Sequence, residues 1–169
     1  MASVANKPSL VERDSGLRFL IIDRPTAANL DAYLREFAAH KVSDIARACE
    51  SDAFYPRERV EAVGVRVHDL AFEDGTPPPA AVIAGWLKVC AGAFGAKGNA
   101  ERRTVAVHCV AGLGRAPVLV AIALIEDGME PIDAVDFIRK QRRGAINAKQ
   151  LEYLQNVYTR QKKGACVVA

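Results

Sequence analysis

Several features that would place a chain outside the class of single globular domains are scarce in this sequence. Only four cysteines occur in 169 residues, which excludes a small disulfide scaffold. The longest uninterrupted apolar run, residues 117–125, is too short to span a bilayer as a helix. No lysine- and arginine-rich run is interleaved with aromatic residues and the net charge is only +3, so we expect no nucleic-acid partner. Residues 1–8 hold no apolar segment, so we expect no secretory signal.

What the sequence does contain is enough apolar material for one substantial core. The chain has a mass of 18.2 kDa and 50% of its residues are hydrophobic, which suits a single domain. Residues 1–16 are polar and include a proline, so we expect a flexible N-terminal arm there. We expect the domain itself to span residues 17–159 and a basic tail to follow over residues 160–169.

Apolar residues recur with periods that alternate between those of strands and those of helices. The predicted strands are residues 18–22, 42–48, 64–70 and 104–108. The predicted helices are residues 30–38, 57–63, 80–94, 115–126 and 132–143, with a last one after Asn147. This alternation predicts an α/β fold with a central, mainly parallel sheet and helices on both faces. Such sheets bind ligands at the carboxyl ends of their strands.

The most informative stretch is residues 105–117, where a strand ends in His108-Cys109 and Arg115 follows with Cys-x5-Arg spacing. A loop between a strand and a helix can point successive backbone N–H groups into one concavity, and the helix adds its positive end. Arg115 can donate two hydrogen bonds to phosphate oxygens. The same field stabilises a thiolate at Cys109, and the thiolate is the nucleophile.

The loop is therefore predicted to bind a phosphate group through its backbone and one guanidinium. The residues concerned are Val110, Ala111, Gly112, Leu113, Gly114 and Arg115. The two glycines allow positive φ without steric cost. From the spacing alone, a buried structural cysteine beside an ordinary glycine-rich turn remains the alternative.

Cleavage of a phosphate ester by a thiolate also needs an acid that protonates the leaving oxygen. Glu73 and Asp74 are the best candidates, because they lie on an irregular loop that continues into Gly75 and three prolines. The alternative for both is a solvated turn. Asp69 is a third carboxylic acid, but it falls within a predicted strand, where capping or pairing is the more ordinary role.

With these motifs in place, the sequence resembles a known family. His108-Cys109-x5-Arg115 is the signature of cysteine-dependent protein phosphatases, and residues 107–121 are similar to the PRL family, the protein tyrosine phosphatases of type IVA. Residues 137–147, with Arg142-Arg143-Gly144-Ala145, are similar to the same family. The resemblance implies a cysteine-phosphatase fold over residues 17–159. It also implies a dual-specificity-type enzyme for phosphotyrosine, phosphoserine and phosphothreonine in proteins, with no cofactor.

The resemblance also implies roles for single residues. Cys109 would form a phosphocysteine, Arg115 would bind the phosphoryl group and Asp74 would be the general acid. Gln150 would orient the hydrolytic water or the substrate, although an exposed helical glutamine is the alternative. Where the family usually has Trp-Pro-Phe-Asp-Asp-Gly, residues 70–75 of this chain read Leu-Ala-Phe-Glu-Asp-Gly, so the stiffness of the loop stays open.

Ala116 stands where most cysteine phosphatases carry a serine or threonine. That hydroxyl donates a hydrogen bond to the cysteine sulfur and helps it leave when water attacks the intermediate. Loss of one hydrogen bond to a charged group costs roughly 1.5–3 kcal/mol, or about ten- to a hundredfold in rate. The sequence therefore predicts slow turnover.

Two further side chains near the motif have predicted supporting roles. A small core residue is the ordinary fate of a lone cysteine such as Cys49, but the resemblance implies that Cys49 forms a reversible disulfide with Cys109. His108 is predicted to orient the loop rather than to act as a base, because an ionised thiolate needs none. His40 and His68 show no ligand spacing with the cysteines, so we expect no metal site.

The last four residues, Cys166-Val167-Val168-Ala169, form a Cys-a-a-X motif that favours farnesylation of Cys166. A frayed apolar tail is the alternative. One lipid chain binds membranes only marginally, and Arg160, Lys162 and Lys163 could add roughly 1 kcal/mol each at an anionic leaflet. We therefore expect the cytoplasmic face of plasma or endosomal membranes, with a cytosolic pool of unprenylated chain.

The resemblance also implies protein partners. PRL proteins bind magnesium-transport mediators of the cyclin M type through the catalytic face, and they self-associate at membranes. A phosphate-loop binding module whose catalysis is incidental is therefore a second hypothesis for function. A lipid phosphatase ranks third, because the loop has no lysine between Cys109 and Arg115.

Overall fold

The computed structural model describes residues 2–95 and 101–161. The strands are β1 (Ser9–Glu12), β2 (Arg18–Ile22), β3 (Val42–Arg47), β4 (Arg66–Asp69) and β5 (Thr104–His108). The helices are α1 (Leu30–Ala39), α2 (Arg57–Glu61), α3 (Ala80–Phe94), α4 (Arg115–Glu126), α5 (Pro131–Gln141) and α6 (Ala148–Asn156). Each predicted strand and helix corresponds to one of these elements, with ends shifted by one or two residues at most.

The strands form a five-stranded sheet in the order β1-β2-β5-β3-β4. β2, β5, β3 and β4 run parallel to one another, and only β1 is antiparallel to its neighbour. β5, which precedes the Cys109 loop, therefore lies between two parallel strands in the middle of the sheet. The predicted α/β fold with a mainly parallel sheet is confirmed.

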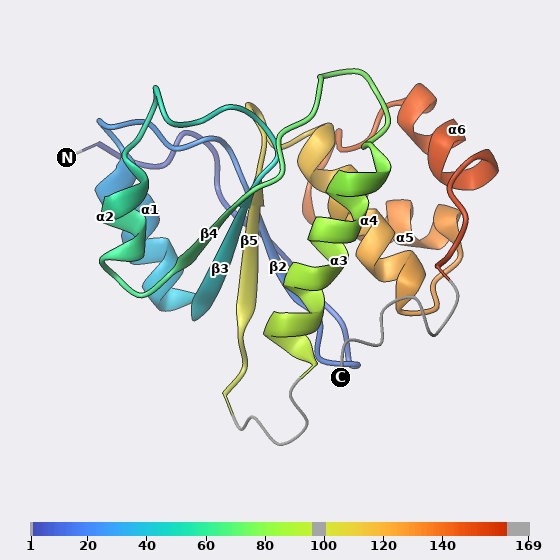
Figure 1. The fold of residues 1–169 in the computed structure, drawn as a ribbon, viewed down its shortest axis with the longest axis horizontal. Coiled ribbons are helices and arrows are strands. Elements are labelled where there is room, and N and C mark those ends of the chain that lie inside the picture. The colour runs from blue at the N-terminus through green and yellow to red at the C-terminus, as the bar shows by residue number, and fades with distance from the viewer. Residues whose placement is uncertain (1, 96–100, 162–169) are drawn as a thin grey trace.

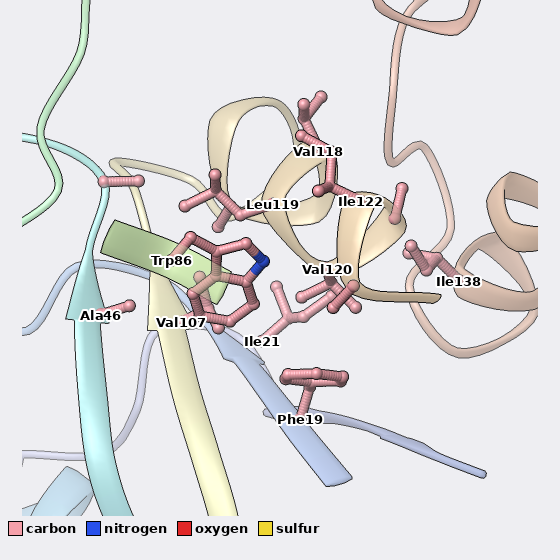
Figure 2. Packing of buried hydrophobic residues seen from close by; sticks show 14 of the residues in the cluster. Phe19, Ile21, Ala46, Trp86, Val107, Val118, Leu119, Val120, Ile122 and Ile138 are labelled. Carbon is pink, nitrogen blue, oxygen red and sulfur yellow. The ribbon is translucent and has the colours of Figure 1, made fainter. Parts of the chain in front are cut away.

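Helices cover both faces of the sheet (Figure 1). α1 and α2 pack on one face, around the buried side chains of Tyr33 and Ile45. α3, α4, α5 and α6 lie on the other face, where the larger hydrophobic cluster forms. Within that cluster the indole of Trp86 packs against the ring of Phe19, with 5.6 Å between ring centroids (Figure 2).

α4 is the central helix of the larger layer. Every residue from Ala116 to Ile125 is buried, as expected for a helix that is hydrophobic on all sides. Because β5 and α4 are both enclosed, the loop that joins them is held at both of its ends. The phosphate-binding motif therefore starts from a rigid strand and finishes on a rigid helix.

The prediction of a loose arm over residues 1–16 is wrong for its second half. Ser9–Glu12 forms β1 and pairs with β2, from Ser9 opposite Ile21 to Glu12 opposite Arg18. Val11 is fully buried in the larger cluster, because the alternating side chains of this short strand face opposite sides of the sheet. A four-residue edge strand carries too little periodic signal to be separated from a polar arm by sequence alone.

Candidate active site

The Cys109 loop leaves the carboxyl end of β5 and ends where α4 begins at Arg115. The side chain of Cys109 is only 4% exposed. The carboxyl end of a central parallel strand beside a helix N-terminus is where open α/β sheets bind their ligands. The first turn of α4 points its unpaired backbone N–H groups toward this loop, as predicted.

The loop holds its backbone carbonyl groups on its outer side. The carbonyl of Val110 accepts a hydrogen bond of 3.0 Å from the backbone N–H of Arg24, and that of Leu113 accepts one of 2.8 Å from the N–H of Ile146. In a trans peptide unit the N–H points opposite to the carbonyl. With its carbonyls bound from outside, the loop has its N–H groups free to face inward, toward an anion.

Arg142 binds the two carbonyls in between. Its Nη2 donates to the carbonyl of Ala111 (2.9 Å) and to the carboxylate of Asp23 (2.6 Å), while its Nε donates to the carbonyl of Gly112 (2.7 Å). Its Nη1 lies within hydrogen-bond distance of the Ser9 hydroxyl (3.2 Å). The five N–H bonds of a guanidinium thus tie the phosphate loop to β1 and to the end of β2.

Sequence reasoning missed Arg142 as a site residue and placed it inside a helix. The helix ends at Gln141, because Arg142 leaves helical geometry (φ −133°, ψ 89°) as its side chain enters the protein. Only the family-like run around Arg142-Arg143 could have pointed to it. Asp23, which was not predicted as a site residue either, has a buried carboxylate that faces Arg142.

Gly112 is required by the crowding that Arg142 creates. Its φ is +67°, and a Cβ added there would lie 2.6 Å from Arg142 Nη2 and 2.6 Å from the carbonyl oxygen of Ile22. Any larger residue would therefore displace the guanidinium or the β2 backbone. This is a stronger reason for the glycine than the conformational freedom inferred from the sequence.

Arg115 and Asp74 face each other across the mouth of the loop. Arg115 Nη1 donates to the carbonyl of Phe72 (3.0 Å), and its Nε lies 3.6 Å from a carboxylate oxygen of Asp74. That Nε has no hydrogen-bond partner among the described residues, although it is buried. The side chain of Asp74 is 79% exposed. Of the two acidic residues on this loop, it is Asp74 and not Glu73 that pairs with Arg115, so the predicted acid lies beside the predicted phosphate ligand.

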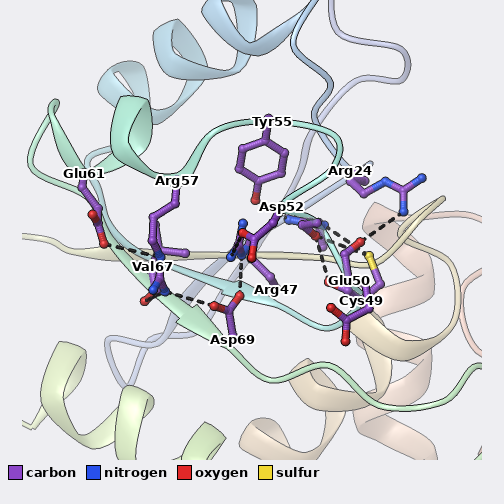
Figure 3. Close-up of polar contacts among 12 residues, drawn as sticks. Arg24, Arg47, Cys49, Glu50, Asp52, Tyr55, Arg57, Glu61, Val67 and Asp69 are labelled. Atoms are coloured by element: carbon purple, nitrogen blue, oxygen red, sulfur yellow. Dashed lines mark hydrogen bonds and ion pairs between the residues drawn. The ribbon is translucent and has the colours of Figure 1, made fainter.

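Asp69, the third acid considered, has a different task. Its carboxylate pairs with Arg47 and Arg57, and Arg47 also pairs with Asp52 (Figure 3). The Arg47 side chain is 1% exposed. The hydrogen bond from Arg47 lowers the pKa of Asp69, so this carboxyl stays ionised and serves to hold the two arginines in place. The interpretation of Asp69 as a pairing residue is confirmed.

His108 is fully buried directly before the nucleophile. Its Nδ1 lies 3.0 Å from the carbonyl oxygen of Cys109 and its Nε2 lies 2.7 Å from the Tyr55 hydroxyl. Since a carbonyl only accepts, Nδ1 carries the hydrogen and Nε2 accepts from Tyr55. Burial is the main cause that lowers the pKa of His108 to about 4, and the nearby positive charge of Arg47 contributes to the same shift. The ring is therefore neutral and fixes the Cys109 backbone, in the orienting role predicted for it.

Cys49 lies near the nucleophile. It follows β3, and in the register of β3 with β5 Arg47 lies opposite His108, so Cys49 and Cys109 emerge at the ends of adjacent strands. The Sγ of Cys49 is 3.9 Å from His108 Nδ1. Both thiols are free and buried.

Gln150 and Ala116 border the loop from the helices. Gln150 forms a capping box with Asn147 at the start of α6: its Oε1 accepts from the Asn147 N–H (3.0 Å). Its Nε2 lies 3.1 Å from where a Cβ on Gly114 would be. Ala116 is fully buried in the first turn of α4. The Nε2 end of the Gln150 amide thus lies close to the loop at Gly114, while its Oε1 serves the helix cap.

Residues 2–95 and 101–161 contain no group of three or more histidine, cysteine, aspartate or glutamate side chains that could hold a metal ion. In the same part of the chain, no helix is long and apolar enough to cross a membrane. Cys166, Lys162 and Lys163, on which the prediction of a lipid anchor depends, lie outside the described residues.

Comparison with known proteins agrees with the geometry. Residues 74–160 match the family model described as protein-tyrosine phosphatase. A probable protein tyrosine phosphatase type IVA A of Dictyostelium discoideum is 48% identical over 165 residues, which cover 98% of this chain and 95% of that protein. The PRL-1 phosphatase of Drosophila melanogaster is 49% identical over 148 residues, covering 88% of this chain and 81% of that protein.

A solved structure is similar as well. That of a putative protein tyrosine phosphatase from Leishmania major superposes with a TM-score of 0.82 and 36% sequence identity, covering 92% of this chain and all of the other. The fold is therefore shared with a protein described as a putative tyrosine phosphatase.

Proposed function

Because this chain belongs to the type IVA protein tyrosine phosphatases and is a tyrosine phosphatase, we propose that Cys109, Arg115 and Asp74 carry its reaction. The observation that supports this assignment most is the backbone of the loop. Four successive carbonyls, those of residues 110–113, are bound from outside, so the N–H groups around Cys109 are left for the phosphate. Arg115, with a buried Nε that lacks a hydrogen-bond partner among the described residues, supplies the remaining donors.

In the first step the thiolate of Cys109 attacks phosphorus in line with the ester oxygen. The S–P bond forms as the P–O bond breaks, and Asp74 in its acid form gives its proton to the leaving oxygen. The loop amides and Arg115 bind the three transferring oxygens, where negative charge is concentrated. Asp74 is placed to reach the leaving oxygen because its carboxylate lies 3.6 Å from Nε of Arg115, the residue that binds the phosphoryl group.

In the second step water attacks the phosphocysteine, Asp74 takes a proton from the water, and the S–P bond breaks to release inorganic phosphate. The leaving sulfur gains negative charge, and Ala116 offers it no hydroxyl donor. We therefore propose that this step is slow and limits turnover.

Rapid mixing with a small aryl phosphate tests both parts of this proposal. We expect a burst of aryl alcohol equal to the concentration of enzyme, followed by a slow steady phase. A linear time course without a burst would show that the second step is not limiting. Hydrolysis that persists in Cys109→Ser would show that the chemistry lies elsewhere.

The proposed substrates are proteins that carry phosphotyrosine, phosphoserine or phosphothreonine. The loop has no lysine that would favour a polyphosphorylated inositol ring. Matched phosphopeptides and an inositol phosphate should be compared by kcat/KM. A clear preference for the inositol phosphate would contradict a protein substrate.

A redox switch between Cys49 and Cys109 is proposed for the same site. Oxidation by a peroxide converts the Cys109 thiolate to a sulfenic acid, and attack by Cys49 then forms the disulfide and releases water. After peroxide treatment, a reductant should restore wild-type enzyme and the matched control Cys90→Ser, but not Cys49→Ser. Full recovery of Cys49→Ser would rule out the protective disulfide.

Membrane attachment through a farnesyl group on Cys166 and the basic tail is proposed from the sequence. It would place the enzyme at the cytoplasmic face of plasma or endosomal membranes, with a cytosolic pool of unprenylated chain. The measurement is fractionation of wild type and Cys166→Ser from cells. If the variant still sediments with membranes, the lipid is not the cause.

A second candidate function is a binding module for a membrane partner, such as a magnesium-transport mediator of the cyclin M type. Three apolar side chains around the loop favour it, because Phe54, Val110 and Leu113 are 39%, 50% and 40% exposed. Arg24 connects them: its guanidinium lies over the Phe54 ring, and its N–H binds the Val110 carbonyl. Calorimetry should find that Asp74→Ala keeps the affinity for the partner and that Leu113→Arg abolishes it. Loss of affinity in both variants would favour an enzymatic role.

A further inference from the structure

A hollow lies between α3 and α4, away from the phosphate loop. Its volume is about 400 Å³, and its lining is mainly apolar. The apolar lining residues are Leu17, Leu87, Cys90, Ala91, Phe94 and Ala123. We call this hollow the α3–α4 groove. None of its lining residues belongs to the catalytic site.

The apolar surface of α3 is wider than the part that packs against the core, and the remainder lines the groove. Leu87, Ala91 and Phe94 follow one another at helical spacing along one side of α3. Leu87 is buried, Phe94 is half-buried and Ala91 is exposed. The apolar side of α3 therefore continues from the core to the surface at Phe94 and Ala91, where a docked segment could cover it.

The chain after α6 is led to this groove by hydrogen bonds to the end of α4. Arg160 Nε donates to the carbonyl of Ile125 (2.8 Å), and the N–H of Gln161 donates to the carboxylate of Glu126 (2.8 Å). The hydroxyl of Tyr158 donates to the same carboxylate. Gln161, the last described residue, is itself part of the groove lining.

We propose that the α3–α4 groove is an intramolecular docking site for residues 165–169. These residues, Ala165-Cys166-Val167-Val168-Ala169, are all apolar. The eight residues after Gln161 can span at most roughly 26–29 Å. Because the segment begins at the groove, its effective concentration there is high. Burial of its side chains against the groove removes apolar surface from water on both partners.

Charge supports the same occupant. Glu126 and Asp127 lie at the end of the groove where the chain leaves α4, and the next two residues after Gln161 are Lys162 and Lys163. Asp127 also pairs with Arg13, and Glu126 accepts hydrogen bonds from Tyr158 and Gln161. In addition to these partners, the two carboxylates would attract the lysines of the docked segment. A docked tail cannot enter a bilayer at the same time. Docking in the groove would therefore lower the fraction of chains whose tail is free to bind a membrane. The docking depends on the apolar side chains and not on prenylation.

Digestion of the unprenylated full chain with a carboxypeptidase tests the proposal, with release of Ala169 and Val168 as the readout. Cleavage requires the undocked tail, so its rate follows the undocked population. Ala91→Arg places a charge in the groove at an exposed helical position and should accelerate release about tenfold. Ala84→Arg, an exposed position two turns earlier on α3 and outside the groove, is the matched control and should leave the rate unchanged. Turnover of an aryl phosphate verifies that both variants are folded.

Equal release from wild type, Ala91→Arg and Ala84→Arg would overturn the proposal. Acceleration by both variants would also overturn it, because the effect would not be specific to the groove. Protection that grows with protein concentration would show that the groove binds the tail of a second copy instead. In the converse experiment, Val167→Asp should raise amide exchange in Leu87–Phe94, and unchanged exchange would again contradict docking.

Discussion

At the residue scale, the phosphate loop depends on side chains that never contact a phosphate. Arg142 uses its whole guanidinium on backbone carbonyls, one carboxylate and one hydroxyl. A glycine is required at position 112 because that guanidinium leaves no room for a Cβ. The conformation of the catalytic loop is therefore held by side chains that bind its outer side.

Arg142→Lys tests this positioning role. Lysine has one compact ammonium group and cannot bind both loop carbonyls and Asp23 in a planar fork. Loss of two hydrogen bonds at about 1 kcal/mol each predicts a drop in kcat/KM of about ten- to a hundredfold, with an equal rise in the inhibition constant of inorganic phosphate. Arg143→Lys, on the exposed neighbouring residue, is the control. Unchanged phosphate affinity in a destabilised Arg142→Lys would mean that Arg142 is only structural.

Ala116→Ser tests the origin of slow turnover. The added hydroxyl would stand in the first turn of α4, where it should donate a hydrogen bond to the leaving sulfur and speed hydrolysis of the phosphocysteine about ten- to a hundredfold. The measurement is the steady-state rate together with the amount of trapped phosphoenzyme. An unchanged rate with the intermediate still present would contradict the explanation.

At the element scale, the loop before α3 brings the acid to the site. Phe72 anchors it, since its side chain is buried in the larger cluster and its carbonyl accepts from Arg115. Asp74 follows two residues later, and Pro77, Pro78 and Pro79 lead into α3. Phe72, which the family pattern shares, therefore anchors the loop here without the tryptophan and proline that usually precede it.

Asp74→Asn and Glu73→Gln form a matched pair of isosteric changes on this loop. Asp74→Asn should lower kcat/KM roughly a hundred- to ten-thousandfold for an ester with a poor leaving group, and much less for a good one. Glu73→Gln should leave both values near wild type, because Glu73 does not pair with Arg115. If the two variants behave alike, the acid has been assigned to the wrong residue.

At the scale of the whole molecule, the site is coupled to folding stability through His108. The folded protein holds this imidazole neutral with a pKa of about 4, whereas the unfolded chain titrates near the ordinary value of 6.5. A depressed folded pKa means that the stabilisation is fully present above pH 6.5. It is lost as the pH falls from 6.5 toward 4, where the unfolded chain binds the extra proton.

Urea unfolding at pH 7 and pH 5 measures this coupling. We expect the wild-type free energy of unfolding to fall by roughly 2 kcal/mol from this residue over that range. His108→Asn, which keeps a donor near the Cys109 carbonyl, should be less stable at pH 7 but should lose less between the two pH values. The same slope in both proteins would assign the pH dependence to other groups.

The sequence by itself determined the elements and the reactive centre. The strand and helix around Cys109 follow from apolar periodicity within a few residues, and Cys109, Arg115 and the glycines of the loop are neighbours in the chain. The acid loop was recognisable because Gly75 and three prolines interrupt the periodicity. Such local signals can be recognised in the sequence without knowing how the elements pack.

Only the tertiary structure decided what supports that centre. Arg142 lies 30 residues from Gly112 in the chain, and β1 became part of the sheet rather than an arm. The sequence pointed to Asp74 as the acid and to a pairing role for Asp69, but their partners, Arg115 for the one and Arg47 with Arg57 for the other, come from distant parts of the chain. A hydrogen bond from one side chain to a remote carbonyl leaves no periodic trace in the sequence, because it depends on where two elements meet and not on the residues beside it.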